Sequence, residues 1–262
     1  MRLLQSSNNG GFSFSEDFVD DEEIPPYAIL SHTWGRTEDE VTFDDIINGT
    51  GQEKPGYDKI RFCREQAKQD SLQLFWIDTC CINKLSSAEL TYAINSMFRW
   101  YGKAKVCYAY LSDAVELLRT SRWFTRGWTL QELLAPERVI FYDTQWARIT
   151  DKRLCCDTIS SITGIPSSVL KKRFCFWSDQ FIRSMDTNDT TVYLWSTGMR
   201  WCSSRKTSRP EDTAYSLLGM FDVNLPLIYG EGEKRAFQRL QLEMVKRTSS
   251  NSLLAWNLDS EL

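Results

Sequence analysis

Short apolar runs that end in small polar or acidic residues recur through the first half of the chain. The first three lie at residues 27–30, 74–77 and 106–111, and a fourth lies at 139–142. Segments with apolar residues at helical spacing separate these runs, and the clearest of them follows a Ser86-x-x-Glu89 pattern typical of a helix start. Strands that alternate with helices predict an α/β fold with a mostly parallel sheet flanked by helices.

Beyond about residue 145 the alternation gives way to segments with helical spacing only. These predicted helices lie at 150–162, 212–219 and 233–247, whereas the pattern of 186–210 predicts no element. We therefore expect a mainly helical extension that packs on the α/β core.

Three parts follow from this pattern. Gly10-Gly11, an acidic run at 20–23 and Pro25-Pro26 predict a flexible, exposed lead-in over residues 1–24. The α/β core is expected to cover residues 25–150, and the helical extension to cover 151–262.

The composition narrows the class of protein. The chain has 262 residues, of which 42% are hydrophobic and 25% charged, as in a globular protein with a substantial core. A net charge of -4 argues against nucleic acid or an anionic membrane surface as the main partner. Because the sequence shows neither a signal peptide nor an apolar stretch of membrane-spanning length, we expect a cytoplasmic protein without membrane contact.

The cysteines and the histidine exclude a familiar class of metal site. The eight cysteines form no Cys-x-x-Cys pattern, and His32 is the only histidine, so we expect no bound metal. A reducing compartment would keep the thiols free.

Polar residues follow the first two predicted strands. Ser31, His32 and Trp34 come after the first strand, and Asp78 comes after the second. Open parallel sheets bind ligands at the carboxyl ends of their strands, so these four residues are candidates for a binding site. A cysteine-dependent hydrolase stays open as an alternative, because Cys80 and Cys81 also follow the second strand and His32 could lower a thiol pKa.

Residues 126–136 carry a sharper pattern. On a helix, Trp128 and Glu132 share a face because they are four residues apart. A carboxylate beside an indole suits the stabilisation of a developing cation, such as the oxocarbenium formed when a glycosidic bond to ribose breaks. The alternative is that Thr129 and Glu132 form only a capping box, which would leave barely six helical residues before Pro136. We favour a longer helix with Glu132 in its interior.

Three blocks of the sequence resemble the signature blocks of the fungal heterokaryon-incompatibility (HET) domain family. They are residues 27–35 (YAILSHTWG), 76–83 (WIDTCCIN) and 126–132 (RGWTLQE), and residues 210–232 resemble the region that commonly follows. One minor departure is Asn83-Lys84, where many members have Asn or Asp followed by Gln or Lys. This family triggers programmed death of fused fungal cells after non-self recognition and is remotely related to TIR domains. The resemblance implies a TIR-like (flavodoxin-like) fold for the core.

The resemblance to TIR enzymes also implies an activity, because they cleave the nicotinamide–ribose bond of NAD with a glutamate on the helix after the third strand. By that likeness Glu132 is the catalytic carboxylate. The nucleotide pocket would be lined by five residues: Ser31, His32, Trp34, Asp78 and Trp128. NAD would be the substrate, with no permanently bound cofactor.

The likeness further implies that the protein works as a homo-oligomer, with a regulatory partner protein or domain as a second candidate. Purely structural roles stay open for the pocket residues: Trp34 and Trp128 as core or wall, Asp78 as a turn cap, and His32 as a donor to the backbone. A catalytically inactive signalling module is the alternative function from a different class.

Overall fold

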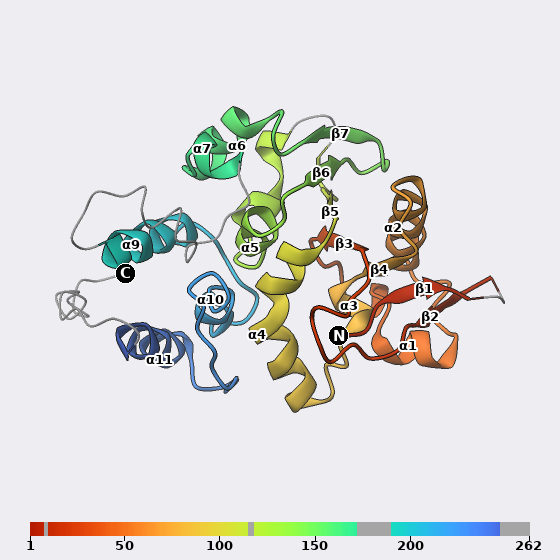
Figure 1. Cartoon of the computed structure of the whole chain (residues 1–262), viewed down its shortest axis with the longest axis horizontal. Helices are drawn as coiled ribbons and strands as arrows, with labels where there is room; N and C mark the ends of the chain where they lie inside the picture. Colours follow the sequence, from red (N-terminus) through yellow and green to blue (C-terminus); the bar gives the residue numbers. More distant parts are fainter. Residues whose placement is uncertain (8–9, 115–117, 172–189, 247–262) are drawn as a thin grey trace.

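The computed structural model describes residues 1–7, 10–114, 118–171 and 190–246, with the side chains of the last segment described from residue 196 onward. Its centre is a seven-stranded sheet with the order β2-β1-β4-β3-β5-β6-β7 (Figure 1). The strands are β1 (Leu4–Ser6), β2 (Phe12–Phe14), β3 (Tyr27–His32), β4 (Leu74–Trp76), β5 (Val106–Tyr110), β6 (Val139–Tyr142) and β7 (Arg148–Asp151).

The four middle strands are parallel and follow the expected apolar runs. β3 pairs with β4 on one side and with β5 on the other, so that Ile29 faces Trp76 and Cys107, and β5 pairs with β6. In chain order these strands lie 2-1-3-4, which is the flavodoxin-like arrangement with its switch point beside the first strand. The predicted α/β class and mostly parallel sheet are confirmed.

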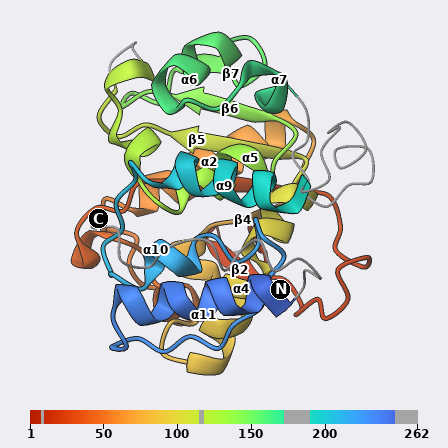
Figure 2. The same cartoon turned by 90° about the vertical axis from the view of Figure 1, so that its left-hand side faces the viewer.

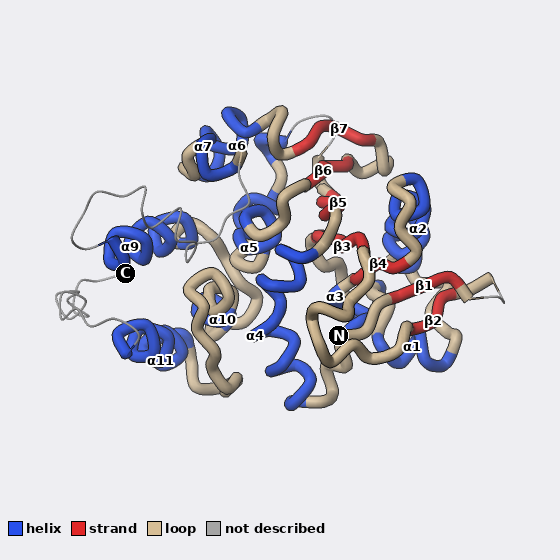
Figure 3. The backbone as a smooth tube through the Cα atoms, in the orientation of Figure 1, coloured by secondary structure: helices blue, strands red, loops and turns tan. Residues whose placement is uncertain are grey.

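Helices cover both faces of this sheet. α2 (Tyr57–Gln69) lies on one face, and α4 (Ser87–Lys103) and α5 (Thr129–Leu134) lie on the other (Figures 1 and 3). α4 begins where the sequence predicts, because the Ser86 hydroxyl accepts a hydrogen bond from Glu89 N (3.3 Å). Only half of the expected capping box forms, since the Glu89 carboxylate accepts from Asn83 N instead.

Shorter helices connect the main elements. They are α1 (Phe43–Asn48), α3 (Asp78–Cys81) and the 3₁₀-helices η1 (Thr37–Asp39), η2 (Leu118–Thr120) and η3 (Arg122–Thr125). α1 begins with a complete capping box between Thr42 and Asp45 and ends at Gly49, whose positive φ of 67° suits a glycine.

The first 24 residues differ from the flexible lead-in that the sequence predicts. β1 joins the sheet antiparallel to β4, and Leu3 and Leu4 are fully buried. The acidic run is also held, because the Glu22 carboxylate pairs with Lys103 (2.7 Å) and Asp21 pairs with Arg99, both on α4. Most of the acidic run is exposed, as the sequence predicts, but Asp21 and Glu22 are held by ion pairs with α4.

The extension is helical, as expected, apart from its first residues. The helices are α6 (Cys156–Thr163), α7 (Ser167–Leu170), α9 (Thr190–Cys202), α10 (Asp212–Tyr215) and α11 (Glu233–Lys246). The helix predicted to start at residue 150 starts later, because 148–151 pairs with β6 as an antiparallel edge strand. α9 occupies part of the stretch for which the sequence predicts no element.

The extension lies against the side of the core that carries α4 and α5 (Figure 2). The packing is tight at Gly219, where an added Cβ would lie 2.2 Å from the Cβ of Phe98 on α4. Within the described residues, no helix has the length and apolar character needed to cross a membrane.

Candidate functional site

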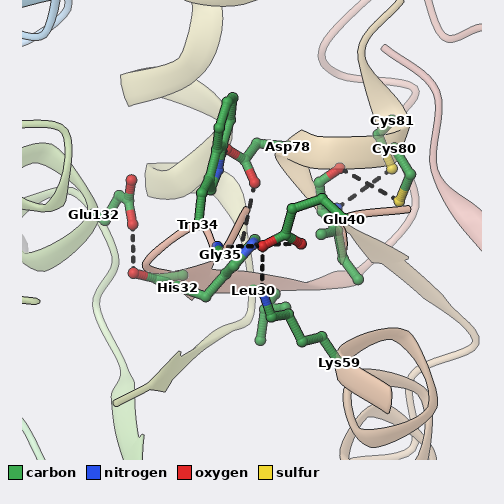
Figure 4. A network of polar contacts seen from close by, with 12 residues as sticks. Leu30, His32, Trp34, Gly35, Glu40, Lys59, Asp78, Cys80, Cys81 and Glu132 are labelled. Atoms are coloured by element: carbon green, nitrogen blue, oxygen red, sulfur yellow. Dashed lines mark hydrogen bonds and ion pairs between the residues drawn. The ribbon is translucent and has the colours of Figure 1, made fainter. Parts of the chain in front are cut away.

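The polar residues predicted at the strand ends meet at the carboxyl end of β3. Successive side chains of a strand point to opposite faces, so Ser31 and His32, the last two residues of β3, face different neighbours. Ser31 meets Glu132 of α5, and His32 lies between Glu40 and Asp78. Figure 4 shows Glu132 to one side and the other carboxylates gathered around His32.

Glu132 forms the buried end of the site. Its carboxyl accepts a hydrogen bond from the Ser31 hydroxyl, which in turn accepts one from Trp123 Nε1 (2.7 Å). Only 7% of Glu132 is exposed, and this burial raises the pKa of its carboxyl to about 8, with the charge of Asp78 acting in the same direction. Ser31 and two arginines oppose that rise only in part, so Glu132 is mostly protonated at neutral pH.

The helix that carries Glu132 settles the two interpretations of residues 126–136. The longer helix that we favoured is wrong, because α5 has six residues and Glu132 lies in its first turn. Thr129 does not cap it, because the Thr129 hydroxyl donates to the backbone oxygens of Trp123 and Arg126 instead. The threonine thus ties α5 to the preceding 3₁₀-helix.

His32 lies between two carboxylates. Its Nε2 is 3.8 Å from Glu40 Oε2, its Nδ1 is 3.8 Å from Asp78 Oδ1, and 1% of its side chain is exposed. Neither ring nitrogen has a hydrogen-bond partner among the described residues, so the expected alternative of a backbone bond is wrong. A buried imidazole flanked by two acidic groups is suited to holding both of them in place.

Glu40 also belongs to this network, although no sequence pattern indicated it. Its Oε1 accepts hydrogen bonds from Gly35 N (2.6 Å) and from Lys59 Nζ (2.5 Å). Burial alone would raise the pKa of the Glu40 carboxyl, but His32 and Lys59 outweigh burial and hold that pKa well below its ordinary value. Glu40 is therefore ionised. In the sequence it follows Glu38 and Asp39, and such a charged run is typical of an exposed loop.

Trp34 and Asp78 form the open end of the site. Trp34 is 44% exposed, and its Nε1 donates to Asp78 Oδ2 (2.7 Å). The ammonium of Lys84 lies 3.7 Å from the centre of the Trp34 ring. Asp78 is the first residue of α3, but its carboxylate makes no capping hydrogen bond to the helix backbone. It accepts the hydrogen bond from the Trp34 indole instead.

Trp128 lies away from the other candidates. Its Nε1 donates to Asp212 Oδ2 (3.2 Å) on α10, so the indole nitrogen faces the extension. The same Asp212 accepts from the hydroxyl of Tyr229 (3.0 Å). The site predicted from the sequence is thus assembled by five of its six residues, with Trp128 joining α5 to the extension.

The thiols give no support to a cysteine-dependent hydrolase. Cys80 and Cys81 are buried, and burial raises the pKa of the Cys80 thiol well above its ordinary value. A nucleophilic cysteine needs the opposite shift. Cys81 Sγ accepts from Ile77 N (3.3 Å), as expected of a packing residue at a helix start.

The remaining described cysteines are also free thiols. In the part of the chain that the structure describes, no cluster of three or more His, Cys, Asp or Glu side chains could hold a metal ion.

Comparison with known proteins agrees with the sequence blocks. Residues 27–117 match the family model described as heterokaryon incompatibility protein (HET). The chain is 45% identical over 259 residues to "Vegetative incompatibility protein HET-E-1" of Podospora anserina; the match covers 94% of this chain but 18% of that protein. The chain thus spans about a fifth of the length of this relative. No solved structure matches significantly. On the family match and this similarity, the chain belongs to the heterokaryon-incompatibility (HET) domain family.

Proposed function

We propose that this HET domain acts as a cell-death effector by cleaving the bond between nicotinamide and ribose in NAD, with Glu132 as the catalytic carboxylate. The observation that carries the proposal is the position of Glu132. A buried glutamate, hydrogen-bonded to Ser31, lies beside the carboxyl end of the first parallel strand, where open α/β sheets bind ligands.

The chemistry needs a negative charge at one point. When the C–N bond breaks, nicotinamide leaves with the bonding electron pair and the ribose becomes an oxocarbenium ion. An ionised Glu132 would stabilise that cation until water adds to the ribose carbon and releases a proton. The products are nicotinamide and ADP-ribose.

The protonation state of Glu132 makes the described structure a resting state for this reaction. With a pKa raised to about 8 by burial, most of Glu132 carries a proton at neutral pH and stabilises no cation. The nicotinamide ring of NAD is positively charged, so its arrival would favour the carboxylate. Ring and carboxyl can meet only after the site opens, because 7% of Glu132 is exposed.

Assembly into homo-oligomers is the step we propose for that opening. A cytoplasmic enzyme that depleted NAD constitutively would kill its own cell, so activity must depend on a switch. If only the assembled state is competent, specific activity rises with protein concentration by mass action.

The test is NAD consumption by the purified chain across a dilution series, with light scattering on the same samples and Glu132→Gln as the matched control. Activity that grows with the assembled fraction and vanishes in the control supports the proposal. An active protein that stays monomeric with constant specific activity would contradict the switch. Absence of NAD cleavage by a fully assembled protein would contradict the chemistry.

One observation favours a second candidate, a catalytically silent module that signals death by recruiting a partner. The proposed catalytic group is sealed from solvent in the described structure. Expression of Glu132→Gln separates the two functions, because a silent module would keep its full toxicity without the carboxylate.

A further inference from the structure

The segment after α9 runs beside the start of α5. Lys206 N donates to Thr125 O (2.7 Å), and Gly127 N donates to Lys206 O (2.9 Å). Gly127 leaves no room in this joint, because an added Cβ would lie 2.5 Å from Thr207 Cγ2. The entrance to the helix that carries Glu132 is therefore fixed by the extension, outside the region matched by the HET family model.

Arg205 is the charged residue of this joint. Its Nη1 donates to Arg126 O (2.8 Å) and to the Thr129 hydroxyl (3.0 Å), and its Nε donates to Trp201 O (3.2 Å). All of these acceptors are uncharged. The residue is 9% exposed, and its buried Nη2 has no hydrogen-bond partner among the described residues.

A buried guanidinium without a carboxylate partner is costly for the fold. Burial lowers the pKa of Arg205 to about 10, while the charges of Cys202 and Glu132 oppose the decrease, so Arg205 stays charged at neutral pH. For stability alone, an apolar side chain of similar volume would serve as well or better. The positive charge of Arg205 is therefore expected to stabilise a neighbouring group in its charged form.

Glu132 is such a group, because the positive charge of Arg205 favours its carboxylate form. Three charged groups act on its carboxyl: Asp78 from α3, Arg126 before α5 and Arg205 from the extension. Tyr101 from α4 and Cys107 from β5 also face it, but burial and the charge of Glu132 raise their pKa values well above the ordinary range, so both are neutral. Only the two arginines favour the carboxylate form, and Arg205 is the more buried of them.

We propose that Arg205 is a positioning residue for Glu132: it anchors the start of α5 and, together with Arg126, supplies positive charge that favours the Glu132 carboxylate. The inference rests on the proposed function because it takes ionised Glu132 as the working form. The catalytic unit then includes the joint at 205–207 as well as the α/β core.

The test measures the ionisation of Glu132 directly. Carboxyl carbons of glutamate are labelled with ¹³C in the whole chain, and the Glu132 signal is assigned by its loss in Glu132→Gln. Arg205→Met removes the charge and Arg205→Lys keeps it. Arg200→Met is the matched control, because Arg200 lies exposed on α9.

We expect Arg205→Met to raise the titration midpoint of Glu132 by about one pH unit, and Arg205→Lys and Arg200→Met to change it by less than about half a unit. An unchanged midpoint in folded Arg205→Met would overturn the inference, as would an equal rise in Arg205→Lys. If Arg205→Met does not fold, Arg205→Gln keeps hydrogen-bond donors without the charge and must show the same rise.

Kinetics supply the second readout. In Arg205→Met, kcat for NAD cleavage at neutral pH should fall about tenfold while KM changes little, because less of Glu132 is ionised. A protein that cleaves no NAD at all would defeat the proposed function, yet the titration would still decide the role of Arg205. A fall in kcat with an unmoved midpoint would leave Arg205 a merely structural residue.

Discussion

The two ends of the candidate site differ in solvent access and in charge. At the Glu132 end the carboxyl is sealed, bonded to Ser31 and mostly protonated at neutral pH. At the Trp34 end the indole is 44% exposed, with the Asp78 carboxyl bonded to its Nε1 and the Lys84 ammonium over its ring.

This difference separates binding from chemistry. Under the proposed function, the exposed Trp34 end is where a nucleotide would first bind, whereas Glu132 could act only after α5 and its surroundings move. His32 lies between the two ends and holds Asp78 on one side and Glu40 on the other. Substitutions at the two ends should therefore affect different kinetic constants.

The largest effect is expected at the sealed end. Glu132→Gln keeps the size and the bond to Ser31 but removes the negative charge, so NAD cleavage should fall by about 100-fold or more. The measurement is kcat/KM on folded protein, with Glu137→Gln as the control for an exposed glutamate. Full activity in folded Glu132→Gln would end the assignment.

The pH dependence sharpens the same point. Because the carboxylate is the working form and burial raises the Glu132 pKa to about 8, kcat/KM should rise with pH and level off above about 8. The slope below that value should approach about tenfold per pH unit. A profile that is flat between pH 6 and 8 in the free enzyme would mean that Glu132 is not the titrating group.

The open end should govern binding. Trp34→Ala removes an exposed ring face, and a lost stacking contact of about 1–3 kcal/mol should raise KM for NAD about tenfold while kcat changes little. Trp34→Phe keeps an aromatic ring without the bond to Asp78, so its KM for NAD should lie between those of the wild type and Trp34→Ala. A fall in kcat with an unchanged KM would assign Trp34 to the chemical step instead.

The stability of the protein gives an independent signal. The folded pKa of Glu132 is raised from 4.5 to about 8, so its contribution to folding is fully present below pH 4.5 and is lost as pH rises to about 8. Relative to Glu132→Gln, the wild-type free energy of unfolding should fall by about 1.4 kcal/mol per pH unit over that window. Urea unfolding of both proteins at pH 5 and pH 8 measures the difference. If the free energy of unfolding changes equally with pH in both proteins, the Glu132 carboxyl is exposed to solvent.

The smallest effect on turnover is expected from the thiols beside the site. Replacing Cys80 and Cys81 together by serine should keep NAD cleavage within about twofold, at a stability cost of about 1–3 kcal/mol for each hydroxyl buried. Abolished turnover in a folded double variant would revive the cysteine-dependent hydrolase.

Local patterns were enough to predict the parallel strands and the helices α2, α4 and α11, because the buried side chains of such elements recur at a regular spacing. The same patterns missed α9. The same patterns placed polar residues at the ends of β3 and β4, and topology brought them together. The ordered start of the chain was missed because Leu3 and Leu4 form too short an apolar run to indicate β1, a three-residue strand that pairs with both β2 and β4.

Partners that come from distant parts of the chain could not be predicted from any local pattern. Glu40 reaches His32 only through the fold, and Arg205 reaches α5 from 76 residues beyond Thr129. Trp128 shares a helix with Glu132, yet the docking of α10 turns its indole nitrogen to Asp212. The sequence thus indicated Glu132 as a candidate but not Arg205 or the other distant groups that surround it.

The close approach of Gly127 to Thr207 also limits how such proteins can diversify by descent. A side chain at position 127 fits only if the Thr207 side chain moves or is replaced by a smaller one, so the residues at the two positions constrain each other. Recombination between relatives with a breakpoint between these residues would join two halves that were never selected for each other. Recombination that transfers positions 127 and 207 together keeps their contact intact. New alleles are therefore expected to differ mainly at other positions.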